Sequence, residues 1–135
     1  MTAPLHAESP YKGKTGLRRL WNALRYSIAG LKAAWACEDA FRMEVWTALV
    51  AVPLALFLPI QSFEKAMLIG SVLLVMVVEL LNSAVEATVD RISLENHHLA
   101  KRAKDIGSAS VLITLAITAL VWLLVLWPYI PKWLE

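Results

Sequence analysis

Polar residues at helical spacing, between Glu79 and Asp90, carry the side chains best suited to chemistry. They interrupt an otherwise apolar run, and they are Glu79, Asn82, Ser83, Glu86 and Asp90. At about 100° of rotation per residue, these side chains fall within one stripe about 100° wide. An ionised acid at the centre of a membrane-spanning helix costs roughly 2.5–3.5 kcal/mol. We therefore expect Glu79 and Glu86 to face protein, water or a bound cation.

Two uses of this polar stripe are open. Asn82 and Ser83 alone suffice for a polar seam that joins helices. Two carboxylates on one face, however, repel each other unless a proton or a cation lies between them. The stripe therefore favours a site for metal binding and proton transfer, with the helix seam as the alternative.

The composition is typical of an integral membrane protein. Of the 135 residues, 59% are hydrophobic and six are tryptophan, and the mean hydropathy is +0.58. Soluble domains contain a smaller fraction of hydrophobic residues than this chain does. The polar N-terminus lacks an apolar stretch followed by a cleavage site, so we expect no removable signal peptide. The single cysteine, Cys37, excludes a disulfide within the chain.

The hydrophobic runs predict an all-α membrane protein with three spanning helices, because about 20 apolar residues cross a bilayer. We place these helices at residues 41–60, 66–89 and 106–129. The charged segment between them, residues 90–105, is too polar to cross, and we expect a cytosolic loop that is partly helical. The third helix opens with small residues from Gly107 to Ser110, which permit close helix approach.

A fourth, amphipathic helix is predicted over residues 16–36. Its apolar residues recur at helical spacing, and basic residues occupy most of the remaining faces. Such a helix suits the cytosolic headgroup layer, where cations meet anionic lipid. Packing on the protein itself is a compatible alternative. With the spanning helices, it makes residues 16–135 a single membrane-embedded domain.

Residues 1–15 lack periodicity and contain prolines, glycine and charges, which predicts a flexible cytosolic tail. Gly13, Lys14 and Thr15 match the end of a phosphate-binding loop. Glu8 stands where that pattern requires its first glycine, and no buried strand precedes it. We therefore do not assign a phosphate loop.

The basic residues predict the orientation of the chain. Seven lie at or before Arg42 and four follow Asp90, which leaves Lys65 and Lys132 for the other side. The excess of lysine and arginine marks the cytosolic side. We therefore expect a cytosolic N-terminus and a polar stripe in the cytosolic half of the second spanning helix.

Three groups of residues then converge on the cytosolic side. They are the polar stripe, an acidic patch (Glu38, Asp39, Arg42 and Glu44) and a cationic segment (Lys101, Arg102 and Lys104, with Asp105). This combination favours phosphoryl transfer. Carboxylates and nucleotide phosphates share Mg²⁺, cations neutralise the transferring group, and a further carboxylate accepts a hydroxyl proton. His97 and His98 either contact phosphate or are solvated.

Two rival classes remain open from the residues alone. One is a proton-coupled transporter subunit, in which Glu79 and Glu86 relay protons. The other is a non-catalytic membrane assembly factor. A transporter does not need the cationic segment beside the carboxylates, and an assembly factor does not need Glu86.

Four segments resemble the prokaryotic diacylglycerol kinase family. They are GLKAAWACEDAFRME (Gly30 to Glu44), VELLNSAVE (Val78 to Glu86), EATVDRI (Glu86 to Ile92) and RAKDIGSASV (Arg102 to Val111). The resemblance covers about Leu17 to Trp127. It implies a homotrimer in the bacterial inner membrane that phosphorylates a lipid alcohol from magnesium ATP at the cytosolic interface, with no nucleic-acid partner. Members act on diacylglycerol, the favoured substrate, or on undecaprenol, and no residue decides between them.

The resemblance also implies roles for individual residues. Glu79 becomes the base for the lipid hydroxyl, and Glu38 and Glu86 become metal ligands that also contact ATP. The further nucleotide contacts are Arg19, Tyr26, Glu95, Asn96, His97, Lys104 and Asp105. The lipid contacts are Arg19, Ala23, Lys32, Trp35, Phe41, Glu44, Phe57, Glu79 and Ser108. Lys32 stands where the family has arginine and Phe57 where it has tryptophan, so contacts to the lipid chains stay open.

Overall fold

The computed structural model describes residues 16–92 and 97–131, all of which lie in helices or in short connections between them. The helices are α1 (Leu17–Cys37), α2 (Asp39–Phe57), α3 (Ser62–Ile92) and α4 (His98–Leu126), and α4 continues into the 3₁₀ turn η1 (Trp127–Tyr129). The predicted tail, residues 1–15, lies outside the described residues. The prediction of an all-α protein is confirmed.

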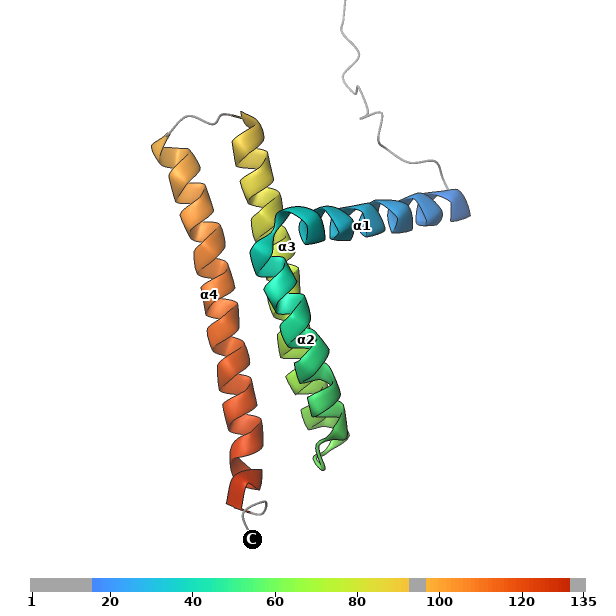
Figure 1. Ribbon diagram of the computed structural model, residues 1–135, viewed down its shortest axis with the longest axis vertical. Helices are drawn as coiled ribbons and strands as arrows, with labels where there is room; N and C mark the ends of the chain where they lie inside the picture. The colour runs from blue at the N-terminus through green and yellow to red at the C-terminus, as the bar shows by residue number, and fades with distance from the viewer. Residues whose placement is uncertain (1–15, 93–96, 132–135) are drawn as a thin grey trace, which may run out of the picture.

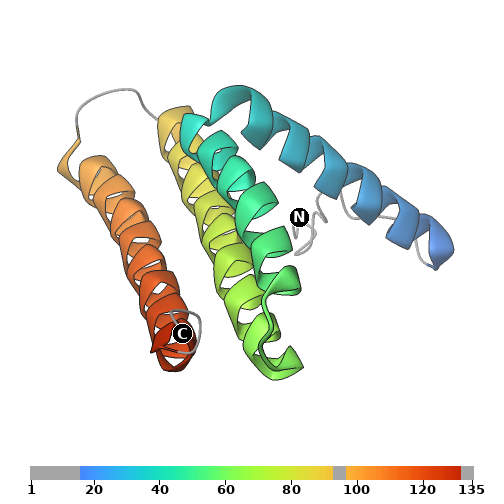
Figure 2. The same cartoon turned by 60° about the horizontal axis from the view of Figure 1, so that its bottom comes forward.

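Three of the helices lie side by side, and the fourth projects away from them. Figures 1 and 2 show α2, α3 and α4 running along one another, while α1 branches from the start of α2 and points away from the bundle. Helix α3 packs against both α4 and α2, and its contact with α4 is the more extensive. The polar stripe of α3 therefore lies where other elements can reach it.

The three bundled helices are each long and apolar enough to cross a membrane. This confirms the three predicted spans, although the helix ends differ from the predicted ones. Helix α2 begins before residue 41 and ends at Phe57, because Leu58 leaves the helical region with ψ 139° one residue before Pro59. The residue before a proline is disfavoured in helical geometry.

The segment over residues 90–105 is more helical than the partly helical loop that the sequence predicts. Helix α3 continues to Ile92 and α4 begins at His98, so the connection is much shorter than predicted. Lysine, arginine and alanine, which fill residues 100–104, favour helix in water as much as in protein. Hydropathy shows where a helix leaves the hydrocarbon layer and does not show where the helix ends. At 1.5 Å per residue, the 31 residues of α3 extend about 46 Å, beyond the roughly 30 Å of hydrocarbon.

Helix α1 matches the predicted 16–36 to within one residue at each end. Its large apolar residues are exposed, from 43% for Trp35 to 86% for Leu17, and α1 makes few contacts with the rest of the chain. A helix with one apolar face and little protein to cover it is the kind that lies in a membrane interface. Of the two alternatives, the exposure favours a surface helix.

The buried core lies along the first half of α3, where Leu68, Val72 and Val75 are at most 6% exposed. Polar groups in this region are paired across helices. Thr118 Oγ1 on α4 donates to the carbonyl oxygen of Ser71 at 3.1 Å, and Tyr129 Oη donates to Glu64 Oε2 at 2.7 Å. These bonds join the ends of α3 and α4 that lie away from the polar stripe.

Candidate active site

Four acidic side chains from three elements gather around the middle of α3. Glu79 is only 4% exposed, and it interacts electrostatically with Glu38 and with Glu86. Glu44 of α2 interacts in turn with Glu79. Like charges this close require a proton, a cation or a positively charged partner. The structure therefore assembles the kind of carboxylate cluster that the polar stripe predicts.

Glu38 occupies the corner between α1 and α2. Its backbone is extended (φ −115°, ψ 110°), so α1 ends and α2 begins at this residue. Arg42 holds the corner, because its Nη1 donates to the carbonyl oxygens of Trp35 at 2.8 Å and Ala36 at 3.3 Å. Arg42 also pairs with Asp39. The final carbonyls of α1, which have no partner inside the helix, are thereby satisfied, and the position of Glu38 is fixed.

A cation from α4 lies against the Asp90 end of the polar stripe. Lys104 Nζ donates to Asp90 Oδ1 at 2.9 Å and to Oδ2 at 3.2 Å. Lys104 also interacts electrostatically with Glu86 and Glu38. The predicted meeting of the cationic segment and the polar stripe therefore occurs through one residue, held by an ion pair.

Several polar atoms near the cluster are buried without a hydrogen-bond partner among the described residues. They are Glu44 Oε2, Asn82 Oδ1 and Ser83 Oγ. The other end of the Asn82 amide is bound, because Nδ2 donates to Glu86 Oε1 at 3.3 Å. An unpaired buried polar group usually costs about 1–3 kcal/mol. Glu44 Oε2 and Ser83 Oγ are available to a ligand, whereas Asn82 Oδ1 lies against Gly107 of α4.

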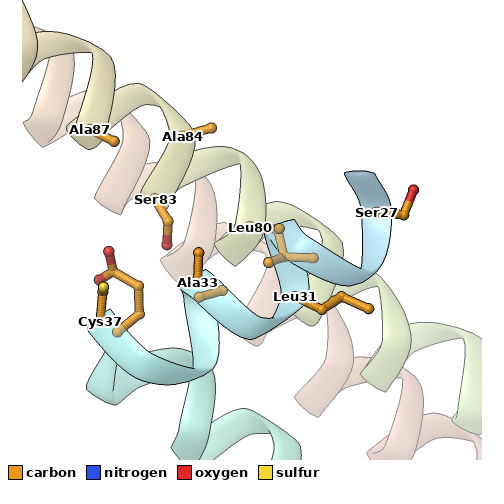
Figure 3. Close-up of a pocket in the computed structure, with 11 residues that line it drawn as sticks. Ser27, Leu31, Ala33, Cys37, Leu80, Ser83, Ala84 and Ala87 are labelled. Carbon is orange, nitrogen blue, oxygen red and sulfur yellow. The ribbon is translucent and has the colours of Figure 1, made fainter. Parts of the chain in front are cut away.

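A cavity of about 600 Å³ lies between α1 and α3 beside this cluster (Figure 3). Small or apolar side chains make up most of its wall, including Leu31, Ala34 and Leu80, and its polar lining includes Glu38 and Ser83. Figure 3 shows Leu31, Ala33 and Cys37 of α1 facing Leu80 and Ser83 of α3 across the space. The cavity thus joins an apolar volume to one edge of the carboxylate cluster.

Some predicted site residues lie away from the cluster within this chain. Arg19, Ala23, Tyr26 and Lys32 are exposed along α1, and Arg19 is 19 residues, or about 28 Å of helix, from Glu38. Phe57 is 86% exposed at the opposite end of α2. By contrast, Trp35 and Phe41 flank the α1–α2 corner, where Trp35 packs near Trp46 with ring centroids 6.3 Å apart.

The predicted nucleotide contacts at the α3–α4 connection are only partly described. Glu95 and Asn96 lie outside the described residues. His97 caps α4, because its Nδ1 accepts from the backbone N–H of Leu99 at 3.3 Å, and its ring lies 4.5 Å from that of His98. Asp105 and Ser108 are exposed on α4.

The donor set fits a magnesium ion that also binds phosphate. Within residues 16–92 and 97–131, no three histidine, cysteine or acidic side chains gather as a complete metal site. Magnesium, however, is commonly held by one or two carboxylates together with substrate phosphates and water. Glu38 and Glu86 supply two such carboxylates, so they fit this mode and not an all-protein cage.

Two features of the site were not predicted. The contacts of Arg42 with the end of α1 cannot be derived from spacing, although the acidic and basic residues around Glu38 mark a helix end. The ion pair between Lys104 and Asp90 depends on how far α3 and α4 extend, which hydropathy does not give. The small residue Gly107, in contrast, lies in the close helix approach that the sequence predicts, directly opposite Asn82.

Comparisons with known proteins agree with this geometry. The family described as Prokaryotic diacylglycerol kinase matches residues 25–126. A diacylglycerol kinase of Pseudomonas aeruginosa is 49% identical over 118 residues, covering 87% of this chain and 96% of its own. One from Escherichia coli is 49% identical over 115 residues, covering 85% and 94%. One from Haemophilus influenzae is 54% identical over 108 residues, covering 80% and 92%.

Proposed function

Because this chain belongs to the prokaryotic diacylglycerol kinase family and so phosphorylates diacylglycerol, we propose that it takes the phosphoryl group from ATP at the cytosolic face of a bacterial inner membrane. The observation that carries this proposal is Glu79, a buried carboxylate in a membrane-spanning helix, with Glu38 and Glu86 beside it. The transporter and assembly-factor alternatives are not retained, since neither is a kinase.

Glu79 acts as the general base. The free hydroxyl of diacylglycerol attacks the γ-phosphorus of ATP, and the bond from that phosphorus to the β–γ bridging oxygen breaks. Glu79 accepts the hydroxyl proton, and ADP leaves. Its burial supports this role, because a carboxylate shielded from water keeps the proton transfer inside the site.

Glu38, Glu86 and Lys104 organise the phosphates. Glu38 and Glu86 would hold a magnesium ion together with the nucleotide, and that ion would neutralise charge on the phosphate oxygens. Lys104 adds a positive charge whose position is set by Asp90, 2.9 Å away. Arg42 keeps Glu38 at the helix corner, so the two carboxylates approach the same nucleotide from different elements.

The cavity between α1 and α3 supports the choice of a lipid substrate. Its walls are mainly apolar and include a hydroxyl, Ser83 Oγ, that has no partner among the described residues. An acyl chain or glycerol backbone that enters here lies next to Glu38. The family resemblance implies lipid contacts at Trp35, Phe41 and Glu44, which lie around the same corner. We propose these contacts on that basis.

The first experiment measures transfer directly. Purified protein in mixed micelles is incubated with labelled ATP, magnesium and one of several lipid alcohols, including diacylglycerol and undecaprenol. We expect labelled phosphatidic acid from diacylglycerol, and at least about 10²-fold less of it in the matched reaction with the Glu79→Gln variant. Labelling of undecaprenol alone would contradict the choice of substrate, and labelling of no lipid would contradict the kinase assignment.

The assembly is proposed to be a homotrimer with sites shared between chains. Arg19 supports this proposal, because it lies about 28 Å of helix from Glu38 on the part of α1 that points away from its own bundle (Figure 1). A neighbouring chain brings such a residue to another chain's carboxylates. Arg19→Ala and Glu79→Gln, each nearly inactive alone, should then recover partial activity after subunit exchange in detergent. Activity that stays at the level of the two single variants, with exchange confirmed by tagged subunits, would reject the shared site.

A further inference from the structure

Among the described glycines, Gly107 of α4 is the one that lies closest to another helix, α3. A β-carbon at Gly107 would overlap Oδ1 of Asn82 and would lie 3.3 Å from its Cγ and 3.9 Å from its Cα. The other described glycines, Gly16, Gly30 and Gly70, have no such neighbour within 4 Å. Within the described chain, Gly107 is therefore the glycine whose missing side chain matters for packing between helices.

The atom that Gly107 accommodates belongs to an amide that is bound at its other end. Asn82 Nδ2 donates to Glu86 Oε1 at 3.3 Å, and Asn82 Oδ1 is buried without a partner against α4. A β-carbon at residue 107 would turn the Asn82 amide. Because Nδ2 and Oδ1 rotate together, the turned amide would lose its hydrogen bond to Glu86. The amide therefore fits the space that Gly107 leaves open.

We infer that Gly107 is a positioning residue for phosphoryl transfer: the space beside it seats the Asn82 amide, which in turn orients the carboxylate of Glu86 toward the magnesium nucleotide. This inference rests on the proposed role of Glu86 as a metal ligand. Hydrogen bonds from a second residue commonly fix the orientation of a ligating carboxylate, and their loss typically weakens metal binding about 10-fold to 100-fold.

A role in packing alone makes a different prediction. If Gly107 only permits helix approach, an added methyl group lowers stability and leaves the metal site of the folded protein unchanged. If Gly107 seats Asn82, the same methyl group weakens metal binding, and the effect depends on the presence of the Asn82 amide. Metal affinity in a double-mutant cycle therefore separates the two roles.

The experiment uses the full chain in detergent with Mn²⁺ as the probe, because Mn²⁺ accepts the same carboxylate and water ligands as Mg²⁺. Electron paramagnetic resonance measures Mn²⁺ affinity in the presence of a non-hydrolysable ATP analogue, for Gly107→Ala, Asn82→Ala and the double variant. Gly70→Ala is the matched control, since it adds the same methyl group to a spanning helix where no heavy atom lies within 4 Å.

We expect Mn²⁺ affinity to fall about 10-fold to 100-fold in each single variant. The double variant should be no weaker than Asn82→Ala alone, and Gly70→Ala should match the wild type. Thermal unfolding gives a readout that needs no metal: Gly107→Ala should lower the melting temperature less when Asn82 is already alanine, because the overlap is gone.

Three results would overturn the inference. The first is wild-type Mn²⁺ affinity in folded Gly107→Ala. The second is an effect of Gly107→Ala on metal affinity that is as large with Asn82 absent as with Asn82 present. The third is wild-type affinity in Asn82→Ala, which decides the matter even if Gly107→Ala fails to fold. Failure of the proposed function is a separate outcome, seen as absent lipid phosphorylation by wild-type protein that binds Mn²⁺ normally.

Discussion

Polar groups near the α2–α3 turn are paired, whereas several buried polar groups around the carboxylate cluster are not. Near the α2–α3 turn, Glu64 Oε2 accepts from Tyr129 Oη at 2.7 Å and from the backbone N–H of Gln61 at 2.8 Å. Around the carboxylate cluster, Glu44 Oε2, Asn82 Oδ1 and Ser83 Oγ are buried with no partner among the described residues. Trp122 Nε1 on α4 is a further unpaired atom, but it stands apart from this group in the sequence.

We infer from this difference that the paired groups stabilise the fold, whereas some of the unpaired groups bind a ligand. A paired polar group inside a membrane protein stabilises it, whereas an unpaired one lowers stability by about 1–3 kcal/mol. The unpaired Glu44 Oε2 and Ser83 Oγ are explained if a substrate supplies their partners, whereas Asn82 Oδ1 packs against Gly107. Substitutions near Glu79 should therefore change activity more than stability, and those at the α2–α3 turn should do the reverse.

The largest effect is expected at Glu79. Glu79→Gln keeps the shape of the side chain and removes its capacity to accept the lipid hydroxyl proton, so the rate of transfer should fall by about 10²-fold to 10⁴-fold. Folding and nucleotide binding should stay normal. The rate is measured in mixed micelles with saturating ATP and diacylglycerol.

Glu44→Gln is the matched control, because it makes the same chemical change in a carboxylate near Glu79 that is not assigned as the base. Its rate should fall less than that of Glu79→Gln. A rate within tenfold of wild type for Glu79→Gln would remove that residue from the role of base.

A smaller effect, on magnesium dependence, is expected at Glu86 and Glu38. Each glutamine variant loses an anionic oxygen ligand of the metal. Loss of a residue that only orients a ligand already weakens metal binding about 10-fold to 100-fold, so the magnesium concentration for half-maximal activity should rise about 100-fold. Titration of activity with magnesium at fixed ATP measures this. A Glu38→Gln curve that overlays the wild-type curve would make Glu38 only a helix-end charge.

The next effect is expected for nucleotide affinity, through Lys104. Lys104→Met removes a charge that is paired with Asp90 at the end of the polar stripe. The KM for ATP should therefore rise about tenfold with little change in kcat, as for a lost hydrogen bond to a charged group. Lys101→Met, an exposed lysine of the same helix, is the control. Equal changes in the two variants would point to a general loss of positive charge.

The sequence predicts one side of this comparison better than the other. Helical periodicity places Glu79 and Glu86 on one stripe, and hydropathy finds three spans, because both signals are local to one helix. The pairing of Lys104 with Asp90 depends on the length of α3 and α4 beyond the hydrocarbon layer. The hydrogen bonds from Arg42 to the last carbonyl oxygens of α1 depend on the geometry of the corner between α1 and α2. These contacts between elements need coordinates.

The predicted roles of Arg19, Ala23 and Tyr26 show a second limit. These residues are exposed on α1, and among the described residues of one chain no ion pair links Arg19 to a carboxylate. A site shared between chains is a property of the assembly, so neither the periodicity of α1 nor the fold of one chain can test it. The subunit-exchange experiment addresses this point directly.

The smallest effect on activity, and the clearest effect on stability, is expected at the α2–α3 turn. Tyr129→Phe removes the hydrogen bond to Glu64 and keeps the aromatic ring, so the free energy of unfolding should fall. The melting temperature in detergent should drop by roughly 5 °C. The kinetic constants for ATP and diacylglycerol should match the wild type, because this bond lies at the opposite end of α3 from the carboxylate cluster.

The same substitution in a Glu64→Ala background should lower stability much less, since its partner is already absent. An equal loss in both backgrounds would show that the ring packing and not the hydrogen bond is what Tyr129→Phe disturbs, and a change in kcat would show that the two ends of the bundle are coupled.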